Sequence, residues 1–126
     1  EGIQDCRKIT IDEGRTIDFM GEALRVYATP ELVRDIEHTC RDLLLEHLDA
    51  GEDSVGTRVE IDHTGATLLG MTVSISATIK SVEGRLVTFE VVAEDNIEPV
   101  AKCTHTRFVV ETSKLQQRLQ AKAAKI

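Results

Sequence analysis

The sequence lacks most of the features that assign a protein to a common class. It has no tryptophan, one tyrosine, three phenylalanines and two prolines in 126 residues, with no low-complexity segment. No apolar run approaches the ~20 residues of a bilayer-spanning helix, and the first residues lack the basic-then-apolar pattern of a secretory signal. The motifs GxSxG, HExxH, GxGxxG and the Walker loop are absent. We therefore expect no membrane partner and none of the common serine-hydrolase, zinc-protease or nucleotide-binding sites.

Cysteine is also scarce. The three cysteines (Cys6, Cys40 and Cys103) lie far apart, are odd in number and show no CxxC spacing. This pattern favours free thiols in a reducing compartment over disulfides or a metal site. We therefore expect a cytoplasmic protein.

The charge is acidic overall but basic at one end. The formal net charge is −7, which argues against a nucleic-acid partner. After Thr112, however, all charged side chains are cations: Lys114, Arg118, Lys122 and Lys125. Their spacing of four, four and three residues places them on one helical face. Such a face is either simply solvated or able to bind a compact polyphosphate.

The hydrophobic pattern predicts one long helix, then four strands, then a short helix. The strands alternate apolar and polar residues between turn signals; they cover Ser54–His63, Met71–Val82, Leu86–Ala93 and Val100–Glu111. A helix from Ser113 follows, and a strand over Arg15–Met20 has weaker support. This order favours a single α+β domain over residues 1–126, with the helix packed on one face of an antiparallel sheet. Such a sheet readily pairs with a second copy.

The predicted long helix is amphipathic. It begins at Thr29-Pro30-Glu31, with Thr29 as N-cap, and ends near Leu48. At about 100° per residue, one stripe is apolar: Leu32, Val33, Ile36, Cys40, Leu43, Leu44 and Leu48. The opposite arc is polar: Glu31, Arg34, Asp35, His38, Arg41 and Asp42. Two polar residues, Glu37 and His47, fall inside the apolar stripe. We interpret His47 as a partner of the helix's negative end and Cys40 as a core residue.

A second polar residue occupies an apolar row in the strand that follows. Val55, Thr57, Val59 and Ile61 alternate on one face, and His63 closes that row. Glu37 and His63 are therefore expected to point into one interface between helix and sheet. An acid and an imidazole in such a place can transfer protons near neutral pH. A carboxylate reaching water at the stripe's edge, and a satisfied core histidine, are the structural alternatives that the pattern leaves open.

Several segments, in order, resemble the fluoroacetyl-CoA thioesterase-like family of hotdog-fold acyl-CoA thioesterases. The resemblance extends from about Tyr27 to Val110. The matching segments are Ala28–Glu37, Gly51–Thr57, Asp62–Thr67 with Gly70, Val82–Arg85 and Thr104–Val110. No single motif is decisive, but the ordered set is specific.

The resemblance implies the following roles. Thr29, Glu37 and His63 match the family's catalytic threonine, glutamate and histidine. Glu37 would attack the thioester carbonyl or activate water, His63 would assist proton transfer, and Thr29 would position the reacting groups. Gly56 matches a glycine whose backbone N–H stabilises the oxyanion, and Arg107 an arginine on the coenzyme A side of the pocket.

The resemblance also implies an assembly. The family fold is a long helix wrapped by an antiparallel sheet, in a homodimer whose active sites lie at the interface; a homotetramer is the alternative. It requires no metal, and no cofactor beyond the coenzyme A carried by the substrate. The basic C-terminal face would then contact coenzyme A phosphates, if it binds any.

Residues 1–26 resemble the family poorly. This is where the fluoroacetyl-specific member carries an aromatic lid, whereas Phe19 and Tyr27 are the only aromatic residues before position 89. We therefore expect a general short-chain acyl-CoA thioesterase rather than a fluorine-selective one. Two other functions fit the same fold: an acyl-CoA-binding regulatory module without catalysis, and an enoyl-CoA hydratase or dehydratase.

Overall fold

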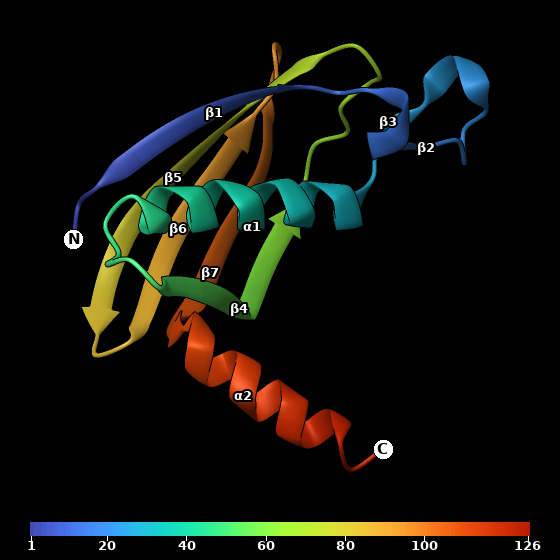
Figure 1. Ribbon diagram of the computed structural model, residues 1–126. Helices are drawn as coiled ribbons and strands as arrows, with labels where there is room; N and C mark the ends of the chain where they lie inside the picture. Colours follow the sequence, from blue (N-terminus) through green and yellow to red (C-terminus); the bar gives the residue numbers. More distant parts are fainter.

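The computed structural model describes residues 1–126. Five strands form one antiparallel sheet in the order β1-β5-β6-β7-β4. Their bounds are β1 Gln4–Thr10, β4 Glu52–His63, β5 Thr72–Glu83, β6 Leu86–Glu94 and β7 Pro99–Glu111. Helix α1 (Thr29–Leu45) lies across one face of the sheet, and α2 (Thr112–Ala123) extends away from it (Figure 1). The predicted α+β arrangement is confirmed.

Helix α1 packs by its predicted apolar stripe. Leu32, Ile36 and Cys40 are fully buried and pack against the inward-facing side chains of β5, β6 and β7. Burial raises the pKa of the Cys40 thiol to about 12, which agrees with a core residue rather than a nucleophile. The helix ends at Leu45, so His47 lies exposed in the turn beyond it. Neither helix is long and apolar enough to cross a bilayer.

The start of α1 differs from the sequence prediction. Ala28 occupies the N-cap and makes no side-chain capping bond, while Thr29 is the first helical residue and Pro30 follows it. Proline suits this place because the first helical N–H groups have no intrahelical partner. The Thr29 hydroxyl is therefore not used as a cap, and it bonds elsewhere.

The N-terminal segment contains an edge strand that the pattern did not indicate. β1 pairs with β5 over its whole length, and its side chains alternate between exposed and half-buried. Most are polar, so the alternation carries no apolar signal. The predicted strand over Arg15–Met20 reduces to β2 (Thr16–Ile17), which pairs only with β3 (Val26–Tyr27).

A β-bulge just after Gly56 changes which side chains of β4 face the helix. Before the bulge, Gly56 lies opposite Arg107; after it, Val59 lies opposite His105. Both partners are buried on the helix side of the sheet. Because a bulge adds one residue to the alternation, Val55 turns outward. The predicted unbroken row is therefore wrong at Val55 and correct from Val59 onward.

Candidate active site

Thr29 and His63 meet where α1 begins and β4 ends. Thr29 Oγ1 lies 2.7 Å from Nδ1 of His63. The other ring nitrogen, Nε2, is buried and has no hydrogen-bond partner. Burial lowers the pKa of His63, so its imidazole is neutral at pH 7. A neutral ring held through Nδ1 leaves Nε2 without a hydrogen-bond partner in the protomer.

Glu37 lies two turns further along α1, above the first half of β4. Its Oε2 is 3.6 Å from Nη1 of Arg107, and its side chain stays 38% exposed. A methyl group on Gly56 would fall 2.7 Å from the same oxygen. Glycine at position 56 therefore leaves the space that the carboxylate occupies, and the remaining exposure lets a substrate reach it.

Arg107 is fixed behind Glu37 by two other side chains. Its Nε donates to Oγ of Ser54 at 2.7 Å, and its Nη2 donates to the Ser54 carbonyl at 2.9 Å. Its Nη1 lies 3.1 Å from Nε2 of His105. Because arginine has no acceptor, His105 Nε2 must accept, and its Nδ1–H donates to the Arg58 carbonyl at 2.8 Å. Burial lowers the pKa of Arg107, yet a guanidinium stays protonated in proteins. The network holds a cation beside Glu37.

Sequence reasoning missed two members of this network, Ser54 and His105. His105 could have been found by the argument that located His63, because it is a polar residue in an inward row of β7 that also holds Cys103 and Val109. Ser54 carried no such signal. Arg107 was expected on the coenzyme A side of the pocket, which stays a prediction; its guanidinium is only 5% exposed.

The residues predicted to be catalytic form two separate groups in one chain, which we call half-sites. The Thr29–His63 pair lies at one end of the contact between α1 and β4. The Glu37–Arg107 cluster (Glu37, Gly56 and Arg107) lies near the middle of that contact, which continues to the Arg41–Asp53 ion pair. From Thr29 to Glu37 the helix advances about 12 Å, and from Gly56 to His63 the strand advances about 20 Å. No hydrogen bond joins Glu37 to His63. Both side chains face the interface between helix and sheet, as predicted, but they do not share one pocket within a protomer.

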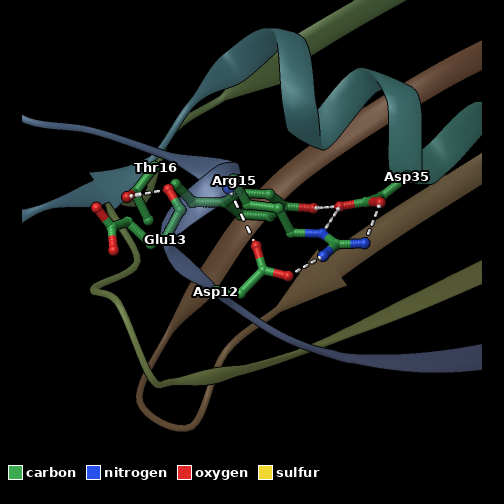
Figure 2. Close-up of polar contacts among 6 residues, drawn as sticks. Asp12, Glu13, Arg15, Thr16 and Asp35 are labelled. Atoms are coloured by element: carbon green, nitrogen blue, oxygen red, sulfur yellow. Dashed lines mark hydrogen bonds and ion pairs between the residues drawn. The ribbon is translucent and has the colours of Figure 1, made fainter.

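One residue of the predicted polar arc is buried. Asp35 is 8% exposed; Arg15 donates to both of its carboxylate oxygens, at 2.9 and 3.1 Å, and the Tyr27 hydroxyl also donates to it. Figure 2 shows Asp35 reaching from the helix to the Arg15 guanidinium. The helical wheel could not anticipate this because the segment before α1 folds over that face.

Buried histidines predict that acid destabilises the fold. Burial lowers the pKa of both His63 and His105, so just below the ordinary value of about 6.5 the unfolded chain binds more protons than the folded one. The free energy of unfolding therefore rises with pH through this window and reaches its full value above it. Thermal unfolding should give a lower Tm at about pH 5.5 than at about pH 7.5, with a smaller difference in His105→Gln. Equal Tm values in the unmodified protein would contradict this assignment.

Comparison with known proteins identifies the family of this chain. The family model for fluoroacetyl-CoA-specific thioesterases matches residues 11–113. This chain belongs to that family. It is 35% identical over 97 residues to the fluoroacetyl-CoA thioesterase of Streptantibioticus cattleyicolor, covering 77% of this chain and 70% of the relative.

Solved structures share this fold. The fluoroacetyl-CoA thioesterase FlK superposes with a TM-score of 0.87 at 29% identity, covering 96% of this chain and 95% of FlK. A hot-dog-like protein from Thermanaerovibrio acidaminovorans gives a TM-score of 0.88 at 26% identity, covering 96% and 90%. The family member described here is accordingly a thioesterase of hotdog fold.

Proposed function

We propose that this protein hydrolyses short-chain acyl-CoA thioesters to a carboxylic acid and free coenzyme A. The observation that carries the proposal is the pair of half-sites: a carboxylate held beside a buried cation, and a neutral histidine oriented by a threonine. Family membership supports the thioester as substrate, since the relative with 35% identity is named for a thioester of coenzyme A.

The Glu37–Arg107 cluster supplies the group that attacks or activates water. Arg107, 3.6 Å from Glu37, orients the carboxylate, and the backbone N–H of Gly56 stabilises the carbonyl oxygen as it becomes an oxyanion. Glu37 either adds to the carbonyl carbon, forming an anhydride that water then cleaves, or takes a proton from the attacking water. In both routes the C–S bond breaks, and the thiolate of coenzyme A leaves and takes up a proton.

The Thr29–His63 pair supplies proton transfer. Because burial keeps His63 neutral, it accepts a proton from water and delivers it to the departing thiolate. Mass spectrometry of His63→Ala after mixing with substrate separates the two routes. An acyl group found on Glu37 supports nucleophilic attack, and its absence supports activation of water.

We further propose that the two half-sites are joined in a homodimer. β4 is an edge strand of the sheet, so its outer backbone groups are free to pair with another chain. The two half-sites lie at Gly56 and His63 of β4, so antiparallel pairing of two β4 strands about a point between Val59 and Glu60 places the Glu37–Arg107 cluster of one subunit beside the Thr29–His63 pair of the other. Val59, 36% exposed between the half-sites, would be covered by this pairing.

A short acyl group fits the surroundings of these residues. None of the five principal surface hollows of one protomer is lined by Glu37 or His63, so none of these five supplies a long acyl pocket beside them. Phe19 is 70% exposed, and Tyr27 is buried against Asp35. Neither residue is thus placed as an exposed ring packed over Glu37, and we expect no selection for fluorine.

An acyl-CoA panel tests the proposal directly. Release of free thiol from acetyl-, propionyl-, butyryl- and fluoroacetyl-CoA should be fastest for the short acyl groups, with similar kcat/KM for acetyl- and fluoroacetyl-CoA. Tight binding without thiol release over hours would instead show a binding module. Loss of enoyl absorbance with crotonyl-CoA, without thiol release, would show a hydratase.

The basic face of α2 carries a separate prediction about substrate affinity. No residue of α2 is buried, and Lys114 and Arg118 line a groove of about 650 Å³ together with Arg85 and Phe108. If this face contacts the coenzyme A phosphates, replacing its four cations (Lys114, Arg118, Lys122 and Lys125) with glutamine should raise KM severalfold and leave kcat nearly unchanged. A steady-state comparison with the unmodified protein measures both constants, and an unchanged KM would show that the face is only solvated.

A further inference from the structure

Two contacts that orient His63 come from one short segment, residues 27–29. Thr29 Oγ1 holds Nδ1 at 2.7 Å. The Tyr27 ring meets the imidazole edge-on, with ring centroids 6.5 Å apart and planes at 76°. Since Nε2 has no hydrogen-bond partner of its own, these two contacts help to set the direction in which it points. Whatever fixes this segment therefore fixes the proton-transfer group.

The segment is held on its other side by a partly buried ionic network. Tyr27 is 2% exposed, and its hydroxyl donates to Asp35. Arg15 donates to both oxygens of Asp35, and its third nitrogen, Nη1, donates to Asp12 at 2.7 Å. Figure 2 shows this chain of contacts running from α1 through the Arg15 guanidinium to Asp12. A backbone hydrogen bond also links the two segments, since the N–H of Ala28 donates to the Arg15 carbonyl at 2.9 Å.

A buried carboxylate is costly unless it is paired and hydrogen-bonded. Apolar residues would have filled this space without that cost, so stability alone does not explain Asp35 at this position. The network does restrict the orientation of the Tyr27 side chain. Because Asp35 accepts two bonds from Arg15 and one from the Tyr27 hydroxyl, the Tyr27 ring has one arrangement beside His63.

We propose that Tyr27, Asp35 and Arg15 are positioning residues that hold His63 in its reactive orientation. The proposal rests on the proposed function, in which His63 transfers the proton. None of the three needs to touch the substrate. Their contribution belongs to the chemical step rather than to binding, so it appears in kcat rather than in KM.

A matched pair of variants tests this. Asp35→Asn removes the charge that holds Arg15, and Asp42→Asn removes a carboxylate of the same helix that pairs with Arg7 at 2.8 Å. Both ion pairs tie α1 to the N-terminal segment, but only the first leads to His63. Asp35→Asn should lower kcat about tenfold or more with little change in KM, while Asp42→Asn should stay within about twofold of the unmodified protein. Equal effects of the two variants on kcat would overturn the proposal.

Conservative substitution adds a second test. Arg15→Lys keeps the charge but not the two-pronged geometry, so its kcat should lie between those of Arg15→Met and the unmodified protein. If Arg15→Met left kcat unchanged, the network would have no positioning role.

NMR of the His63 ring gives a readout that does not depend on turnover. In Asp35→Asn, and in Tyr27→Phe, which removes only the hydroxyl, the His63 resonances should shift and broaden and titrate at a different pH; in Asp42→Asn they should not. Unchanged His63 signals in Tyr27→Phe would overturn the proposal even if Asp35→Asn failed to fold. If the unmodified protein released no thiol from any acyl-CoA, the proposed function would be wrong. The NMR spectra would still show whether the network orients His63.

Discussion

Glu37→Gln is expected to lower kcat for acyl-CoA hydrolysis by about 10²–10⁴-fold. Glutamine has nearly the same shape, but it is neither a nucleophile nor a base, so both routes proposed for Glu37 are lost. The fold should survive, because Arg107 keeps its bonds to Ser54 and His105. KM should change little, since the carboxylate acts on the carbonyl and not on the carrier. Thiol release under steady-state conditions measures both constants.

Glu46→Gln provides the matched control for this variant. Glu46 lies at the C-terminal end of the same helix and is exposed, so its loss should leave kcat unchanged. His63→Ala should reduce kcat by a similar order to Glu37→Gln, because the departing thiolate loses its proton donor. Normal turnover in both Glu37→Gln and His63→Ala would remove the proposed mechanism.

Gly56→Ala is expected to abolish most of the activity while leaving the fold intact. The added methyl group would sit 2.7 Å from Oε2 of Glu37 and 3.2 Å from Cε1 of His105. The nearest atom belongs to the end of a flexible side chain, so the carboxylate can swing aside and the backbone need not move. We expect kcat to fall by about 10²-fold, the loss associated with a misplaced reacting group. Activity and Tm should be measured on the same preparation.

Alanine variants of two other glycines serve as controls for Gly56→Ala. A methyl group on Gly14 would lie 3.7 Å from its nearest neighbour, an ordinary contact, so Gly14→Ala should change neither activity nor Tm. A methyl group on Gly65 would lie 2.4 Å from the Pro99 carbonyl oxygen, which belongs to the backbone. Gly65→Ala should therefore lower stability by about 1–3 kcal/mol, as overpacking does. If Gly56→Ala lowered Tm as much as Gly65→Ala and spared kcat, the space at Gly56 would serve packing and not catalysis.

The architecture could be predicted from the sequence because its main elements carry strong periodic signals. Helix α1 has apolar residues such as Leu32, Ile36 and Leu43 at helical spacing, and β5 to β7 alternate with period two. The same periodicity singled out Glu37 and His63 as polar residues in apolar rows. Their placement on the helix side of the sheet follows from that pattern alone.

The periodicity of the sequence did not predict the features that depend on contacts between distant segments. β1 is a mostly polar edge strand, and only its pairing with β5 defines it. The bulge after Gly56 shifts the alternation of β4 by one residue, and no apolar signal marks it. Asp35 was predicted to lie on the surface because a helical wheel describes a single helix. It cannot show that Arg15 and Tyr27, from the preceding segment, cover Asp35.

The sequence pattern also did not predict that the two half-sites are separated within one chain. Periodicity states which face a side chain occupies, but it does not state how far apart two side chains lie along that face. Glu37 and His63 share the face between helix and sheet, yet Glu37 contacts Arg107 and His63 contacts Thr29. Their distance within one chain makes the second subunit necessary to the proposed mechanism.

Mixing two inactive variants tests the central claim most directly. Glu37→Gln and His63→Ala should each be nearly inactive alone, and they should be unfolded and refolded together at equal concentration. If each active site takes Glu37 from one subunit and His63 from the other, half of the dimers are mixed and each has one intact site of two, so thiol release should recover to about a quarter of the unmodified rate. Recovery to that level is the result we predict. Formation of mixed dimers without any recovery would contradict the account, because it would show that the two residues must act within a single chain.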